Sequence, residues 1–182
     1  RLKGGDVSLF SNILDELQVL LENGIPYEII PGISAAFGAA AYAGIPLTAR
    51  NYARSVRFLT GHTGREIPES YWKDLATTED TLVFYMSTET LNEVVENLLA
   101  HNISSDKFIA VVEQATTHAQ NVFVSGIYQC MEGFAKIRFT TPSLLIIGKV
   151  VALHEQFAWL RNSHSGEKYF EPLTEVYNKA AV

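Results

Sequence analysis

Residues 81–117 read TLVFYMSTETLNEVVENLLAHNISSDKFIAVVEQATT, and this stretch indicates the fold class. Its two ends, Thr81 to Met86 and Phe108 to Val112, are rich in β-branched and aromatic residues, which favour strands. Between them, apolar residues recur every three or four positions, as on one face of a helix; they are Leu91, Val94, Val95, Leu98 and Leu99. A strand, a helix and a strand in succession predict an α/β layer fold.

Further strand-like runs lie on both sides of this unit. They are Val56 to Thr60, Gln120 to Ser125 and Leu144 to Val150. We expect a short helix over Ile127 to Phe134 and a longer one over Val151 to Leu160. Together these elements predict an α/β domain over residues 51–160, which is a usual domain size. The polar residues 161–182 are expected to form a peripheral tail.

The first fifty residues have a different, glycine-rich character. An amphipathic stripe predicts a helix from Phe10 to Leu21, with Ser8 as its cap. A short strand from Tyr27 to Ile30 follows, and an alanine-rich helix is expected over Ala35 to Ala43. This order of elements is that of the C-terminal part of a first α/β domain, covering residues 1–50.

Length, composition and charge exclude several classes of protein. The chain has 182 residues, of which 47% are apolar and 19% charged, so it is long and apolar enough to bury a core. Its net charge of -6 argues against nucleic acid and anionic membranes as partners. No apolar run approaches the ~20 residues of a membrane span.

The cysteine count and the first residue bear on compartment and completeness. Cys130 is the single cysteine, and no Cys or His pair has zinc-ligand spacing, so we expect no intrachain disulfide, no metal and a reducing cytoplasm. The sequence begins at Arg1 without a charged and then apolar leader. We expect an N-terminal truncation that leaves the first domain incomplete.

Gly4-Gly5-Asp6 is the first candidate binding loop. Glycines allow backbone N–H groups to come close to a ligand, and a carboxylate beside them can accept hydrogen bonds from hydroxyl or amino groups. The motif lacks the spacing of a dinucleotide loop or of a P-loop. A tight turn capped by Asp6 is the structural alternative.

Other candidate residues follow predicted strands. The run Pro31 to Ala36 contains Ser34 and Ala35 and opens a helix after a strand, where open α/β sheets bind ligands and where helical N–H donors are free. An ordinary capped helix is the alternative. Met86 ends one predicted strand and Ala115 follows another, and they either border a cleft or serve only the core and a turn.

Basic residues cluster in the middle of the chain. No acidic residue occurs between Glu28 and Glu66, and the basic residues in this interval are Arg50, Arg54, Arg57, His62 and Arg65. In a protein of net negative charge, such a stretch suits a small polyanionic substrate. The alternative is that these arginines pair with acids elsewhere on the surface.

Several short motifs, taken in order, resemble the tetrapyrrole methylases and, among them, the uroporphyrinogen-III C-methyltransferases. They are Arg1-Leu2-Lys3-Gly4-Gly5-Asp6, Gly24-Ile25-Pro26-Tyr27-Glu28, Pro31-Gly32-Ile33-Ser34-Ala35, Tyr42-Ala43-Gly44-Ile45-Pro46-Leu47-Thr48, Ser55-Val56-Arg57-Phe58-Leu59-Thr60-Gly61-His62, Tyr85-Met86, Thr141-Pro142-Ser143-Leu144 and Ile147-Gly148. The resemblance runs from Arg1 to about Leu153.

The resemblance implies two α/β domains with S-adenosyl-L-methionine held between them, usually in a homodimer. It implies cofactor contacts at Gly4, Gly5, Asp6, Leu9, Ser34, Ala35, Met86 and Ala115. The family reaction methylates uroporphyrinogen III to precorrin-2, on the route to siroheme and cobalamin, and releases S-adenosyl-L-homocysteine. Arg50, Arg54 and Arg57 are then expected to bind the substrate carboxylates.

Part of the family pattern has no counterpart here, and this leaves two other functions open. The resemblance places a proton-transfer carboxylate upstream of Arg1, so the catalytic base is unknown and the chain as given is expected to be inactive. The first alternative is a methylase of a later corrinoid precursor. The second is a non-catalytic α/β domain with a methylase-like fold.

Overall fold

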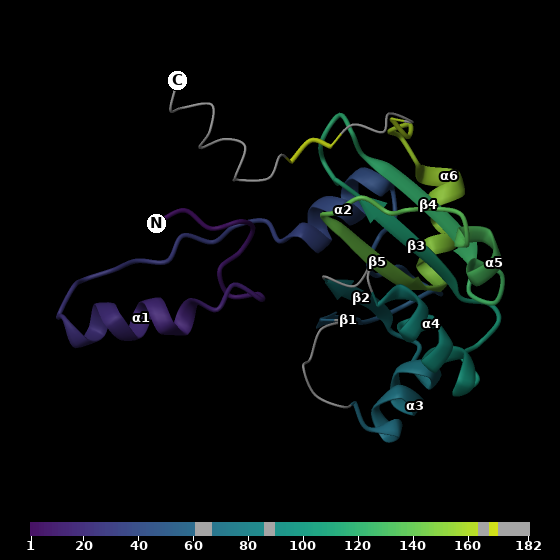
Figure 1. The fold of residues 1–182 in the computed structure, drawn as a ribbon, viewed down its shortest axis with the longest axis horizontal. Helices are drawn as coiled ribbons and strands as arrows, with labels where there is room; N and C mark the ends of the chain where they lie inside the picture. The colour runs from purple at the N-terminus through teal and green to yellow at the C-terminus, as the bar shows by residue number, and fades with distance from the viewer. Residues whose placement is uncertain (61–66, 86–89, 164–167, 171–182) are drawn as a thin grey trace.

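A five-stranded mixed sheet forms the centre of the computed structural model, which describes residues 1–60, 67–85, 90–163 and 168–170 (Figure 1). The strands are β1 (Val56–Thr60), β2 (Thr81–Tyr85), β3 (Phe108–Glu113), β4 (Asn121–Gly126) and β5 (Ser143–Gly148). Their spatial order is β1-β2-β5-β3-β4. This architecture confirms the predicted α/β class.

Strand direction defines two ends of the sheet. β1 and β2 are parallel, and β5 runs antiparallel to both β2 and β3. As a consequence, β1, β2 and β3 all finish at one end, which we call the carboxyl end, at Thr60, Tyr85 and Glu113. β5 and β4 begin there, because Ser143 and Asn121 are both opposite Glu113 in the register. The opposite end of the sheet is the amino end.

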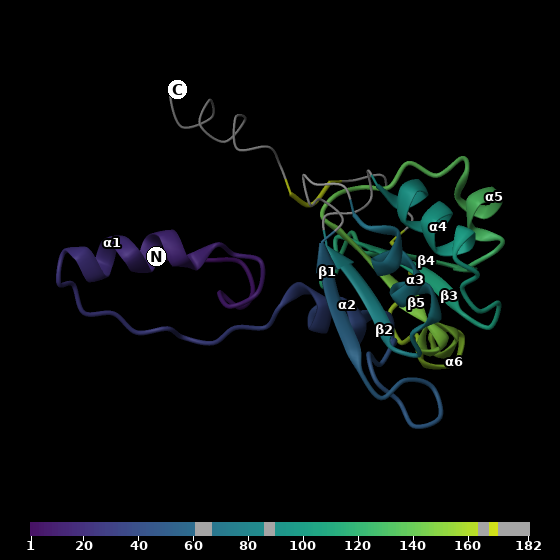
Figure 2. The same ribbon diagram turned by 90° about the horizontal axis from the view of Figure 1, so that it is seen from below.

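Two apolar clusters cover the two faces of the sheet. Alternation along β5 divides its side chains, since Leu145 and Ile147 face one cluster and Leu144 and Ile146 face the other. The first face is covered by α3 (Glu69–Thr77), α4 (Leu91–Ala100) and α5 (Cys130–Phe134). The second is covered by α2 (Ala35–Ala43) and the 3-10 helix η1 (Lys149–Leu153), and α6 (His154–Phe157) follows η1 (Figure 2).

The alanines of α2 explain its close contact with the sheet. Ala36, Ala39, Ala40 and Ala43 are buried and share a cluster with residues of the strands. Side chains this small let the helix backbone approach the strands closely. The bounds of α2 match the prediction, but the helix packs with the sheet of the predicted second domain.

The segment of residues 1–33 contrasts with this packing. Its helix α1 (Ile13–Glu22) has no buried residue and projects away from the sheet in Figures 1 and 2. The predicted start at Phe10 is wrong, because Phe10 and Asn12 have left-handed φ values of 53° and 49° and the helix begins only after them. The predicted strand from Tyr27 to Ile30 is not formed, since it has no neighbouring strand to pair with.

Other helices also differ from the sequence expectation, including α5, which begins at Cys130 and not at the expected Ile127. α3 was not predicted; it starts after Pro68, and its apolar residues Trp72 and Leu75 are separated by polar residues in the sequence but lie in the apolar cluster of the first face. The predicted helix from Val151 to Leu160 is instead η1 followed by α6. The backbone becomes extended at Ala158, where Trp159 donates its indole N–H to the carbonyl of Ala41 at 2.9 Å.

Two described residues beyond position 160, Asn162 and Tyr169, are hydrogen-bonded to β4 and to the residue that follows β3. The side chain of Asn162 accepts from the backbone N–H of Val122 at 2.8 Å and donates to its carbonyl at 2.9 Å, as a neighbouring strand would. The backbone N–H of Tyr169 donates to the Gln114 side chain at 2.6 Å. The expected tail therefore includes ordered contacts near the carboxyl end of the sheet.

Candidate functional site

Two of the predicted binding loops meet near the carboxyl end of the sheet. The backbone N–H of Gly32 donates to Asp6 Oδ2 at 2.8 Å, although the two residues are 26 positions apart. A Cβ atom on Gly32 would lie 2.3 Å from the carbonyl oxygen of Gly5, so only glycine fits there without a backbone shift. The loops of residues 4–6 and 31–34 thus form one junction.

Asp6 is the charged centre of this junction. It also accepts from the backbone N–H of Ser8 at 2.9 Å and from the Ser8 hydroxyl. The Ser8 hydroxyl, followed by the Gly32 N–H, lowers the pKa of Asp6 to about 2, so the carboxylate is ionised at neutral pH. A carboxylate offers about four acceptor positions, and three are used here, which leaves about one for a ligand hydroxyl or amino group.

Tyr85 connects the junction to the sheet. Its hydroxyl, at the end of β2, accepts from the backbone N–H of Ala36 at 3.0 Å and is hydrogen-bonded to the Ser34 hydroxyl. Burial raises the pKa of Tyr85, so it stays protonated at neutral pH. Its ring packs edge-on against Phe10 at 5.0 Å between centroids. Tyr85 was not predicted as a site residue. The sequence did contain a clue, because this residue places a polar hydroxyl at the end of an apolar strand, next to Met86.

The loop that carries Ala115 lies at the same end of the sheet. Gln114 and Thr116 on either side of Ala115 have left-handed φ values of 44° and 70°. A Cβ atom on Gly38 would lie 3.2 Å from the Thr116 methyl group, so this loop packs directly on α2. The backbone N–H of Gln114 donates to the Pro142 carbonyl at 2.8 Å.

The predicted cofactor residues have therefore come largely to one end of the sheet. Gly4, Gly5, Asp6 and Ser34 lie in the two joined loops, and Ala35 begins α2 directly after them. Leu9 donates its backbone N–H to the Asp6 carbonyl at 3.3 Å. Ala115 is linked to these loops through α2. Met86 lies outside the described residues.

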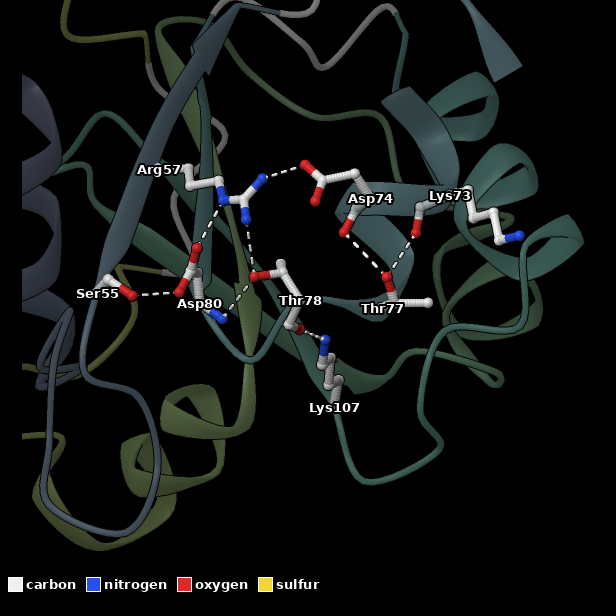
Figure 3. A network of polar contacts seen from close by, with 8 residues as sticks. All are labelled: Ser55, Arg57, Lys73, Asp74, Thr77, Thr78, Asp80 and Lys107. Carbon is white, nitrogen blue, oxygen red and sulfur yellow. Dashed lines mark hydrogen bonds and ion pairs between the residues drawn. The ribbon is translucent and has the colours of Figure 1, made fainter. Parts of the chain in front are cut away.

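Arg57 lies at the amino end of the sheet, opposite these loops. Its guanidinium donates to Asp80 at 2.6 Å, to the Thr78 hydroxyl at 3.0 Å and to Asp74 (Figure 3). These hydrogen bonds, with Asp80 first, raise the pKa of Arg57. The pairing favours the alternative interpretation of this arginine, in which it pairs with acidic residues at the surface.

A buried lysine extends the same network. Lys107 is 2% exposed, and its ammonium group donates to the carbonyl of Thr78 (Figure 3). Burial lowers the pKa of Lys107. The network thus joins β1, the loop before β2 and the loop before β3 at the amino end of the sheet.

Arg50 and Arg54 lie on the connector between α2 and β1. Both are exposed, and neither forms an ion pair with another residue in the described ranges. This connector also precedes the amino end of β1. Arg50, Arg54 and Arg57 are therefore not adjacent to the candidate cofactor loops, and His62 and Arg65 lie outside the described residues.

The described residues contain neither a metal-ligand cluster nor a membrane-spanning helix. Within them, no three His, Cys, Asp or Glu side chains are placed to hold a metal ion. No helix in those ranges is long and apolar enough to cross a membrane. Two cavities of about 630 Å³ each lie next to Phe37 on α2 and next to Phe134 on α5, and none of the predicted site residues lines them.

Comparison with known proteins decides the family. Residues 1–130 match the family model of the tetrapyrrole (corrin/porphyrin) methylases. The chain belongs to this family. A siroheme synthase of Acinetobacter baylyi is 45% identical over 160 residues, which are 88% of this chain and 35% of that protein.

Solved structures of the family share the fold of this methylase chain. A uroporphyrin-III-C-methyltransferase from Thermus thermophilus is 32% identical, with a TM-score of 0.71, over 86% of this chain and 66% of that one. A structure of the same kind of enzyme complexed with S-adenyl homocysteine is 28% identical, with a TM-score of 0.69, over 84% and 66%. The chain spans about a third of the length of the curated relatives it matches.

Proposed function

We propose that this chain belongs to an S-adenosyl-L-methionine-dependent C-methyltransferase of the uroporphyrinogen-III type. We further propose that the carboxyl end of its sheet binds the methyl donor. The observation that carries the proposal is the junction of Asp6 with Gly32, which joins two loops predicted separately from the sequence. The similarity to an enzyme complexed with S-adenyl homocysteine supports the ligand class.

The residues at this end suit such a ligand. S-adenosyl-L-methionine carries ribose hydroxyls and an amino group, and Asp6 retains an acceptor position for one of them. Gly4, Gly5 and Leu9 would present backbone groups beside it. Ser34, Ala35 and Ala115 are small enough to leave room for a planar adenine. We include Met86 on the family resemblance alone.

When bound beside Asp6, the donor would supply an electrophilic sulfonium methyl group to a pyrrole carbon of uroporphyrinogen III, with S-adenosyl-L-homocysteine as the leaving group and loss of a ring proton. Two such transfers would give precorrin-2. The described residues contribute by holding donor and acceptor in line, which lowers the barrier by positioning. We assign no base, since Tyr85 stays protonated at neutral pH.

The remaining assignments are part of the same proposal. The substrate would be a tetrapyrrole polycarboxylate converted to precorrin-2 for siroheme and cobalamin. Arg50 and Arg54 are exposed and lie away from the donor loops, so they would contact only carboxylates on the far side of this substrate. Arg57 is left out because two carboxylates already pair with it. We also propose a cytoplasmic homodimer, without nucleic acid or membrane as a partner. Residues 1–50 and 51–160 would belong to two α/β domains.

Titration of the chain with S-adenosyl-L-homocysteine tests the binding site. We expect Asp6→Ala to weaken binding by roughly tenfold or more, because hydrogen bonds to a charged group are lost. Glu28→Ala is the matched control, since Glu28 is exposed and lies between the two loops in sequence. Equal affinities of Asp6→Ala and the unsubstituted chain would contradict the assignment.

A domain exchange tests the reaction. Residues 1–160 of this chain would replace the matching segment of the Acinetobacter baylyi siroheme synthase. The hybrid is expected to form precorrin-2 from uroporphyrinogen III and S-adenosyl-L-methionine. A folded hybrid that binds S-adenosyl-L-homocysteine but forms no methylated product would overturn the proposed substrate and leave the binding site standing.

A further inference from the structure

Glu113 is a buried carboxyl group to which the proposed reaction assigns no role. It is the last residue of β3 and only 3% exposed. In the register it stands opposite Asn121 on β4 and Ser143 on β5. Three strands therefore meet at this side chain, directly before the loop that carries Ala115.

The carboxyl group of Glu113 has two donors. The backbone N–H of Thr140 donates to Oε1, and the Asn121 side chain is also hydrogen-bonded to it. Burial raises the pKa of Glu113, while both hydrogen bonds oppose that rise. An apolar residue at position 113 would leave the Thr140 N–H without an acceptor. The need for this acceptor explains why an acidic side chain is buried here.

Gln114 continues the connection into the loop. Its side chain, 1% exposed, donates to the Ala119 carbonyl at 3.3 Å and accepts from the backbone N–H of Tyr169 at 2.6 Å. Its own backbone N–H donates to the Pro142 carbonyl at 2.8 Å. Glu113 and Gln114 together fasten the segments around residues 119, 140–142 and 169 to one point.

This attachment has a consequence for Ala115. Left-handed backbone at Gln114 and Thr116 is unfavourable for residues with side chains, so the loop needs external bonds to keep this conformation. Glu113, whose side chain is hydrogen-bonded to Thr140 and Asn121, directly precedes Gln114. Because Glu113 is only 3% exposed, its side chain does not contact a ligand in the site directly.

We propose that Glu113 is a positioning residue, which accepts the Thr140 N–H and so holds the loop of residues 114–117 in the shape that binds S-adenosyl-L-methionine. The inference rests on the proposed function and adds a residue that acts through Ala115 without touching the donor. A glutamine at position 113 keeps an acceptor oxygen for Thr140, whereas a leucine removes it.

Binding and amide exchange in Glu113 variants test the proposal. Glu113→Leu is expected to weaken S-adenosyl-L-homocysteine binding by roughly tenfold and to speed hydrogen exchange at the Ala115 and Thr116 amides by a similar factor. Glu113→Gln is expected to stay within about twofold on both readouts. Glu96→Leu, at an exposed position on α4, is the control for the change of residue type.

Two outcomes would overturn the positioning role. One is unchanged binding and exchange in Glu113→Leu; the other is equal impairment in Glu113→Leu and Glu113→Gln. Should Glu113→Leu fail to fold, Glu113→Asp replaces it, because a shortened side chain draws the carboxylate back from Thr140 and is expected to loosen the loop. If the unsubstituted chain binds no S-adenosyl-L-homocysteine, the proposed function fails, and the exchange rates alone decide whether Glu113 orders the loop.

Discussion

Residues 1–33 and residues 34–163 differ in what supports their elements. In the first region, α1 buries none of its residues, and Leu14 is 73% exposed. In the second, helices pack on both faces of the sheet, and Ile147 is fully buried. The first region touches the second at a few points, including the ring contact of Phe10 with Tyr85.

This contrast shows that periodicity and burial are separate properties. α1 has an apolar stripe, yet the part of the chain that the structure describes buries none of its residues. α2 has an almost uniform run of alanines, yet four of them are buried, because small side chains let its backbone lie against the sheet. An amphipathic pattern therefore predicts a helix, while burial depends on a partner surface elsewhere in the fold.

Truncation of one apolar side chain in each region tests the contrast most strongly. Ile147→Ala is expected to lower the free energy of unfolding by about 2–5 kcal/mol, since it leaves a cavity in the core. Leu14→Ala is expected to change it by less than about 0.5 kcal/mol. Urea unfolding measures both, and similar losses in the two variants would show that α1 is packed in solution.

The polar network at the amino end gives a smaller effect. Arg57→Met is expected to cost about 1 kcal/mol, a value reduced because solvent screens these partly exposed groups. Arg54→Met, the exposed control, is expected to leave stability unchanged. If the two variants have the same free energy of unfolding, the ion pairs of Arg57 do not stabilise the fold. A role of Arg57 in substrate binding would then be open again.

Acid should weaken the same network. The Ser55 hydroxyl and Arg57 hold the pKa of Asp80 below its ordinary value. Its folded pKa is depressed, so its stabilising contribution is present at neutral pH and is lost as the pH falls from about 4 through the folded value. Unfolding curves between pH 6 and pH 3 are expected to show less acid sensitivity in Asp80→Asn than in the unsubstituted chain. Equal sensitivity would contradict this assignment.

The smallest effect concerns the first region alone. Asp6 is expected to titrate in an NMR experiment at about pH 2. Ser8→Ala is expected to move this midpoint upward, because the Ser8 hydroxyl is the main cause of the depression, while global stability stays the same. A midpoint near the ordinary ~3.9 in the unsubstituted chain would mean that the Asp6 junction is not formed.

Local patterns in the sequence predicted much of the second region. The bounds of α2 and β1 match the prediction, and α4 carries the predicted apolar residues, because alanine runs, β-branched runs and apolar periodicity are local signals. α3 was missed because its apolar residues are few and separated by polar ones. The first region was predicted less well, since a strand from Tyr27 to Ile30 requires a partner strand and none lies beside it.

The candidate site divides in the same way. Glycine and small residues marked the loops around Asp6 and Ser34 in the sequence, although the strand predicted before Pro31 is not formed. The partners of Arg57 were not, since Asp74 and Asp80 lie 17 and 23 positions away and are brought near only by the packing of α3 and β2 against β1. Glu113 was hidden for the same reason, because its donor at Thr140 is 27 positions away.

Amide chemical shifts during titration with S-adenosyl-L-homocysteine test the central claim, that the carboxyl end of the sheet is the donor site. We expect shifts at Gly5, Ser34 and Ala115, whose loops lie at that end. The network residues Arg57 and Lys107, at the amino end, are expected not to move. Shifts confined to the amino end, or no shifts at all at saturating ligand, would contradict the account.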